Sequence, residues 1–137
     1  MKQQGFTLIE LMITVVIVAI LARIIIPSYQ TYVKSAKLNE AYNNLTSFRV
    51  QMEQSYQDNN NYGSSSCAVA NPTGTYFTYS CSLANSGQSF TATATGNGTQ
   101  GISGYTFTIA SNGTRTTTAF PSATVPASCW LNNAGGC

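Results

Sequence analysis

The feature that most constrains this chain is an apolar run near its N-terminus. From Phe6 to Ile26 nearly every residue is apolar, after a short leader that carries Lys2 and ends at Gly5. About 20 apolar residues in a helix span the hydrocarbon layer of a membrane. The run has no clear small-x-small site of the kind at which an ordinary signal peptide is cleaved. The sequence therefore predicts a helix that anchors the chain in a membrane.

Glu10 interrupts this run with a carboxylate. A charged group at the centre of a bilayer costs roughly 2.5–3.5 kcal/mol on insertion scales, and such groups usually have a polar partner. The nearby candidates are Lys2 and, if the chain is cut after Gly5, the new amine of Phe6. The alternative is that Glu10 lies close enough to the interface to stay hydrated. We expect a cation in the same layer to neutralise it.

The stretch GFTLIE at residues 5–10 resembles the prepilin signature of type IV pilins. This resemblance implies that a prepilin peptidase cuts between Gly5 and Phe6 and that the Phe6 amine is then methylated. It also implies assembly roles for Phe6, Glu10 and Pro27. In the family, the carboxylate at the Glu10 position pairs with the N-terminal amine of a neighbouring subunit, which is the kind of partner that an intramembrane acid requires.

The helix is expected to continue beyond the apolar run with a change of pattern. Pro27 removes a backbone donor, and we expect a kink rather than a stop because the helical pattern resumes after it. Loop residues from Asp58 onward predict the end of the helix near Gln57. An apolar stripe at steps of three and four residues predicts the face that packs on a core: Leu38, Ala41, Leu45, Phe48, Met52 and Tyr56.

Four strands are predicted after the helix, because threonine alternates with apolar residues in segments that turn residues separate. In the second and third segments, alternate apolar residues share a face that we expect to pack on the helical stripe. Asn112-Gly113 indicates a type I′ hairpin turn before the last strand. The expected strands cover residues 76–83, 89–95, 105–110 and 115–120.

The four cysteines all lie beyond the predicted anchor. An even number in a small exported domain predicts disulfides. Three connectivities are open, and short loops favour Cys67 with Cys81 and Cys129 with Cys137. The chain has no histidine and no Cys-x-x-Cys spacing, so we expect neither a metal site nor a cofactor.

The stretches at 105–109, 115–120 and 129–137 resemble those of the PilE-like branch of the type IVa pilins. The resemblance thus covers almost the whole chain, although residues 59–104 match only in outline. It implies an α+β fold, the type IV pilin fold, in which a long kinked N-terminal helix packs on a four-stranded antiparallel sheet with a C-terminal disulfide loop. The expected parts are a leader at 1–5, a transmembrane and polymerisation half of the helix at 6–28, and a globular head at 29–137. Within the head we expect the second half of the helix at 29–57, a loop at 58–75, the sheet at 76–120 and the disulfide loop at 121–137.

The function is predicted to be structural. Histidine, nucleophile motifs, Gly-rich phosphate loops and paired carboxylates are all missing from the sequence, so we predict no enzymatic activity. The Glu10 carboxylate in the anchor must be buried against another copy of the chain. This indicates a subunit that polymerises head to tail into an open filament. The resemblance implies a type IV pilus (fimbrium) for adhesion, twitching motility or DNA uptake. Its implied partners are other copies of the chain, the prepilin peptidase and the pilus assembly machinery, and its route leads from the inner membrane to the extracellular pilus.

Two alternatives share this fold. A minor pilin that acts as a DNA-uptake receptor requires a basic surface, and only 7% of the residues are charged, with a formal net charge of +2. Lys34, Lys37 and Arg115 are the candidate anion or DNA contacts. A pseudopilin of a secretion system is disfavoured by the two expected disulfides. We therefore predict a major pilus subunit in preference to either.

Overall fold

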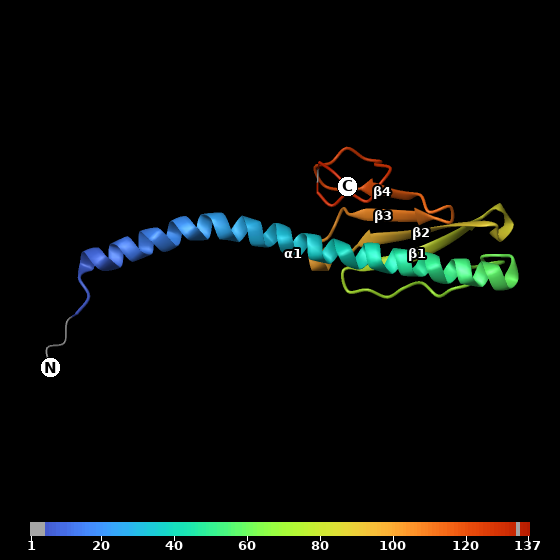
Figure 1. Ribbon diagram of the computed structural model, residues 1–137, viewed down its shortest axis with the longest axis horizontal. Helices are drawn as coiled ribbons and strands as arrows, with labels where there is room; N and C mark the ends of the chain where they lie inside the picture. Colours follow the sequence, from blue (N-terminus) through green and yellow to red (C-terminus); the bar gives the residue numbers. More distant parts are fainter. Residues whose placement is uncertain (1–4, 134) are drawn as a thin grey trace. The chain divides into compact units, whose positions relative to one another are not determined.

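The computed structural model describes residues 5–133 and 135–137 (Figure 1). Residues 1–4 of the expected leader, Lys2 among them, lie outside the described part. The chain forms two compact units, of which the first ends at Lys34 and the second covers Ser35–Cys137. Among the described residues the regular structure comprises one α-helix, four strands and two short 3-10 helices, the last at Asn85–Gly87 and Gly98–Gln100. The helix and strands are α1 at Leu8–Asn59, β1 at Phe77–Ala84, β2 at Ser89–Gly96, β3 at Thr106–Ala110 and β4 at Arg115–Ala119.

The part of α1 that belongs to the second unit packs on the sheet through the predicted apolar stripe. Its spacing of three and four residues places these side chains on one face of the helix. Five of them are buried: Leu38, Ala41, Leu45, Phe48 and Met52. Tyr56, the last residue of the stripe, is half-buried against the same core. Burying a Leu, Phe or Met side chain contributes roughly 1.5–3 kcal/mol, so this stripe is a principal support of the fold.

The sheet is an antiparallel meander with strand order β1-β2-β3-β4 (Figure 1). This arrangement confirms the predicted fold class, and the observed strands begin and end within one residue of the predicted ones. Because side chains alternate along a strand, one face buries apolar residues and the other carries hydroxyls. On β2 the buried residues are Phe90, Ala92 and Ala94. The register lines up Ser80, Thr93, Thr108 and Thr116 across the outer face of the four strands.

The hairpin between β3 and β4 is present, but the predicted turn type is wrong. A type I′ turn needs positive φ at both central residues, and of Asn112 and Gly113 only Gly113 has one, at 85°. The Gly113 N–H instead donates to the Ala110 carbonyl at 2.9 Å, and Asn112 Oδ1 accepts from the Thr114 N–H at 2.9 Å. The connection is two residues longer than a type I′ hairpin loop, so a turn followed by a left-handed glycine reverses the chain.

A disulfide and three hydrogen bonds to Glu40 fix the loop between α1 and β1. The disulfide between Cys67 and Cys81 joins the loop to β1, with the Cα atoms 6.2 Å apart. At the end of the loop, the Glu40 carboxylate on α1 accepts from three successive backbone N–H groups, those of residues 75, 76 and 77, at 2.9–3.1 Å. A carboxylate that accepts several backbone N–H bonds makes strong, charge-assisted hydrogen bonds. Glu40 thus fixes the start of β1 on the helix, a role that the sequence did not indicate.

Candidate functional site

The N-terminal part of α1 exposes an unusually apolar surface. None of the residues in its apolar stretch is buried. Leu8 and Ile24, near the two ends of the run, are 77% and 67% exposed. Large exposed apolar surfaces mark sites of contact with membranes or other proteins. The helix is long and apolar enough to cross a membrane.

Glu10 occupies the first turn of this helix. The Thr7 hydroxyl oxygen accepts a hydrogen bond from the Glu10 N–H at 3.3 Å, which caps the N-terminus of α1. Thr and Glu three residues apart form the sequence pattern of a capping box, a signal that sequence reasoning missed. The positive end of the helix dipole favours a carboxylate in this turn. The N-terminal end of α1 therefore favours the Glu10 charge, while the carboxylate itself stays exposed.

The other predicted processing and assembly residues are accessible. Phe6 is 86% exposed, and a Cβ atom added at Gly5 would touch nothing within 4 Å. Both residues are therefore exposed. Pro27 lies inside α1, and the helix continues through it. The Thr31 hydroxyl donates to the Pro27 carbonyl at 3.1 Å.

The candidate anion contacts differ in their surroundings. Lys37 Nζ donates to the Gln100 carbonyl at 2.8 Å and lies 5.2 Å from the centre of the Tyr76 ring. Its ammonium is thus engaged within the second unit. Arg115 is exposed, and its guanidinium carbon lies 4.6 Å from the centre of the Trp130 ring. Lys34 is exposed at the end of the first unit. Lys37 and Arg115 contact different parts of the second unit and form no common cluster.

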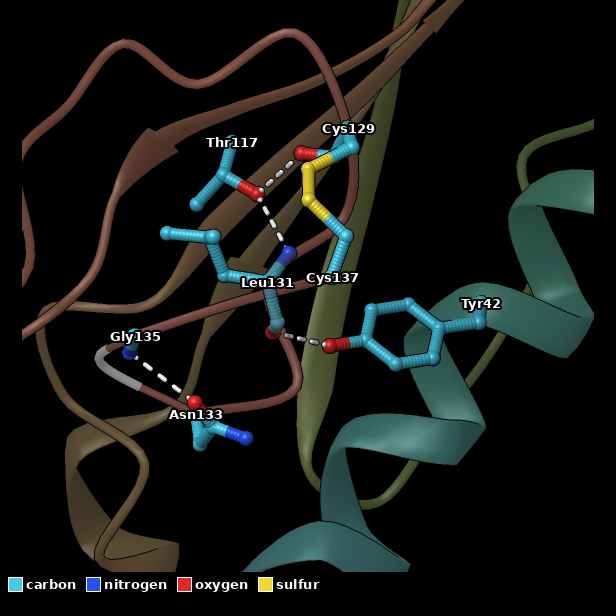
Figure 2. The surroundings of a disulfide bond; sticks show 7 residues. All are labelled: Tyr42, Thr117, Cys129, Leu131, Asn133, Gly135 and Cys137. Carbon is cyan, nitrogen blue, oxygen red and sulfur yellow. Dashed lines mark hydrogen bonds between the residues drawn. A yellow bond between two sulfur atoms is a disulfide. The ribbon is translucent and has the colours of Figure 1, made fainter.

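Trp130 joins Arg115 to the helix. Its indole ring stacks on Tyr42 of α1, with ring centres 5.2 Å apart, and its Nε1–H donates to the Thr108 carbonyl at 2.8 Å. The Tyr42 hydroxyl donates to the Leu131 carbonyl at 2.6 Å, so α1 holds the C-terminal loop directly (Figure 2). The indole is thereby fixed, and the guanidinium that stacks on it is held in a defined place.

Thr117 on β4 holds the same loop from the sheet side. It is fully buried. Its hydroxyl donates to the Cys129 carbonyl at 2.7 Å and accepts from the Leu131 N–H at 2.9 Å, next to the disulfide between Cys129 and Cys137 (Figure 2). This hydroxyl satisfies two backbone groups that β4 itself does not pair.

An open groove of about 430 Å³ lies between α1 and the C-terminal loop. Arg115 and Trp130 line it together with amide side chains of the helix and the loop. The further lining residues are Asn39, Tyr42, Asn43, Thr46, Cys129, Asn132 and Cys137. The groove combines one guanidinium with polar amides, which is a surface for polar or anionic groups.

Three tyrosines that join α1 to the rest of the second unit, Tyr42, Tyr62 and Tyr79, have raised pKa values, and the shift is large for Tyr42 and Tyr79. Burial raises the pKa of Tyr42 to about 12, and the nearby Tyr105 adds to the shift. Burial also raises the pKa of Tyr79 to about 12; the hydrogen bond from Asn44 opposes this shift and Glu40 reinforces it. Both hydroxyls remain protonated at neutral pH, as their hydrogen bonds to backbone carbonyls require.

Comparison with known families identifies the chain. Residues 1–22 match a family model described as the prokaryotic N-terminal methylation motif. Residues 27–103, more than half of the chain, match the model described as "Type IV minor pilin ComP, DNA uptake sequence receptor". The chain belongs to this family. The pilin thus matches both an N-terminal methylation motif and a pilin family, as expected of a type IV pilin.

Relatives of the pilin include several fimbrial proteins. It is 56% identical over 41 residues to the fimbrial protein EcpC of Eikenella corrodens, which covers 30% of the pilin and 27% of EcpC. It is 56% identical over 39 residues to the type IV major pilin protein PilE1 of Neisseria gonorrhoeae, which covers 28% of the pilin and 24% of PilE1. The matches thus span about a quarter of these relatives. They support the PilE-like assignment.

A solved structure agrees with the fold. The non-core minor pilin PilV of Neisseria meningitidis superposes with a TM-score of 0.57 at 19% sequence identity, over 71% of the pilin and 97% of the PilV chain. At this identity the likeness concerns the architecture alone. Together with the helix and the four-stranded sheet, it confirms the type IV pilin fold.

Proposed function

We propose that the pilin is a structural subunit of a type IV pilus and that it polymerises through its N-terminal helix. One observation carries this proposal: α1 exposes a long apolar surface whose single acidic side chain is Glu10. Such a surface is stable in lipid or against equivalent helices, and not in water. The pilin would enter the inner membrane as a precursor, be cut between Gly5 and Phe6, and leave the membrane by packing against other copies in an extracellular fibre.

The proposed assembly step uses the new N-terminal amine. The methylated Phe6 amine keeps its positive charge, so it can pair with the Glu10 carboxylate of a neighbouring copy. In a low-dielectric layer such a pair is far stronger than in water. Because the amine and the carboxylate lie on different copies, each subunit offers one of each, and the contacts repeat without closing. This fits an open helical filament.

Mass spectrometry of filaments sheared from the cell surface tests the proposal. The expected dominant species is residues 6–137 with a methylated amine and two closed disulfides. The proposed role as a filament subunit is contradicted if the pilin stays in the cell envelope and is absent from the sheared fraction. That result would favour a pseudopilin of a secretion system. A trace amount among other pilins would favour a minor pilin.

A DNA-uptake receptor is the second candidate, because the family to which the pilin belongs is described by that function. The exposed Arg115 and Lys34 are then the first residues to examine as phosphate contacts. Duplex binding by the full-length pilin in detergent is the test, measured over a range of salt concentrations. The plot of log K against log salt has a negative slope, and loss of one phosphate contact in Arg115→Ala should reduce the magnitude of that slope by about 1. Absence of salt-dependent binding at low ionic strength would exclude this function.

A further inference from the structure

The second unit holds six charged side chains, and four of them are satisfied within it. Lys37 and Glu40 bond to backbone groups, as described above. Arg49 donates to the Ser111 carbonyl at 3.3 Å and lies 3.8 Å from the Glu53 carboxylate. The Tyr62 hydroxyl also donates to Glu53, at 3.0 Å. The two that remain are an anion, Asp58, and a cation, Arg115.

Asp58 lies in an unfavourable place for a carboxylate. It is exposed in the last turn of α1, where unpaired helix carbonyls concentrate negative charge. That turn contains no basic residue. Within the described part of the chain, the Asp58 side chain forms neither a hydrogen bond nor an ion pair. Its own copy therefore does not compensate this charge.

Arg115 is a cation that, like the anion Asp58, has no partner of opposite charge in the described part of its own copy. One side of its guanidinium stacks on Trp130, which holds the group in place and leaves N–H donors available. Among the described residues it forms no ion pair, although it lines an open groove. A guanidinium with this geometry is suited to bidentate contact with a carboxylate.

The two uncompensated charges are too far apart to meet within one copy. Trp130 places Arg115 beside Tyr42, and Tyr42 precedes Asp58 by about 24 Å along α1 at 1.5 Å per residue. Two copies displaced by about that distance along the helix would bring Asp58 of one to Arg115 of the other. The contact joins different surfaces of the two copies, which is the arrangement that builds an open filament.

We infer that Asp58 of one copy forms an ion pair with Arg115 of a second copy in the assembled filament. This inference rests on the proposed polymerisation. The pair lies between heads, outside the apolar helix contacts, and it is exposed to salt. It therefore sets the longitudinal register of neighbouring heads, while the N-terminal helices supply the main cohesion.

Charge reversal in the full-length pilin tests the inference. The variants are Asp58→Arg, Arg115→Asp and the two combined, each expressed in cells that lack the wild-type pilin. The measured quantity is the share of the pilin that is recovered in sheared filaments, relative to the total in the cell. Each single reversal opposes like charges at two contacts per subunit, so we expect recovery to fall at least about threefold. The double variant should return to within about twofold of the wild type, because it restores opposite charges.

Lys34 supplies the matched control, since it is the other exposed cation close to the head. Lys34→Glu combined with Asp58→Arg should not recover what Asp58→Arg loses. Recovery by this combination, or unchanged yields in all the single reversals, would overturn the inference. A fall in the double variant as large as in the singles would overturn it too, provided that total pilin and both native disulfides are at wild-type levels. Absence of the wild-type pilin from the filaments would instead contradict the proposed polymerisation.

Discussion

At the scale of single residues, Glu10 carries the sharpest consequence for assembly. Glu10→Gln keeps the side-chain size but removes the charge that would attract the Phe6 amine of another copy. We expect the variant to remain in the membrane, because a neutral amide is easier to bury than a carboxylate. Its recovery in sheared filaments should fall at least about tenfold, which corresponds to only 1.4 kcal/mol.

The control for this change is Glu53→Gln, which alters a carboxylate of the head that bonds to Tyr62. Filament recovery for Glu53→Gln should stay close to that of the wild type. Equal losses in the two variants would mean that general instability, and not the charge at Glu10, limits assembly.

The raised pKa values of Tyr42 and Tyr79 predict that the folded state loses stability at alkaline pH. The pKa of each is about 12 in the folded state, against about 10 in an unfolded chain. Between about pH 10 and pH 12, these two hydroxyls therefore stay protonated in the folded state and lose their protons in the unfolded chain. The resulting stability is fully present below about pH 10 and is lost as the pH rises through about 12.

Denaturant unfolding of the pilin at a series of pH values from about 9 to 12 measures this effect. Tyr42→Phe should make the fall in the free energy of unfolding shallower, because one of the two groups no longer titrates. Absorbance of tyrosinate gives an independent reading, in which Tyr42 and Tyr79 ionise late; the pKa of Tyr62 is raised as well, by burial and by its hydrogen bond to Glu53. A wild-type stability that is flat over this range would contradict the prediction.

At the scale of elements, the C-terminal loop depends on one buried hydroxyl. Thr117→Val keeps the shape of the side chain but leaves the Leu131 N–H and the Cys129 carbonyl without their partner. Leaving buried polar groups unpaired costs about 1–3 kcal/mol. We expect the free energy of unfolding to fall by that amount, measured by denaturant titration with the disulfides intact.

Thr118→Val is the matched control, because Thr118 is exposed and its hydroxyl makes only a long contact of 3.4 Å to the Thr106 carbonyl. Its effect should stay within about 0.5 kcal/mol, as for most surface substitutions. Similar losses at both positions would indicate that β-propensity, rather than the buried hydroxyl, is responsible.

The elements themselves were largely predictable, since each is encoded in a local pattern. The spacing of Leu38, Ala41 and Leu45 specifies a helical face, and alternation specifies the strands. The contacts of the C-terminal loop were not predictable. Tyr42 bonds to Leu131 and stacks on Trp130 across almost 90 residues of sequence, and no local pattern specifies which loop a helix will contact. The turn type at Asn112 was missed because loop length decides it along with composition.

At the scale of the whole molecule, the two compact units have different requirements. The head, Ser35–Cys137, has a core and two disulfides of its own. The described part of the first unit, which ends at Lys34, leaves its apolar side chains exposed, and under the proposed function lipid or other copies cover them. A pilin of this kind is stable as a monomer only in a membrane or detergent, so its measured stability will vary with the medium.

The two ends of the segment between Cys67 and β1 are held by contacts that do not involve the residues between them. The disulfide from Cys67 to Cys81 and the three N–H bonds to Glu40 hold both sides of the segment 68–74. Doubling the length of a flexible loop costs only about 0.6 kcal/mol. The segment can therefore gain residues with little effect on folding, which makes it a suitable place to insert a foreign epitope and display it on the pilin.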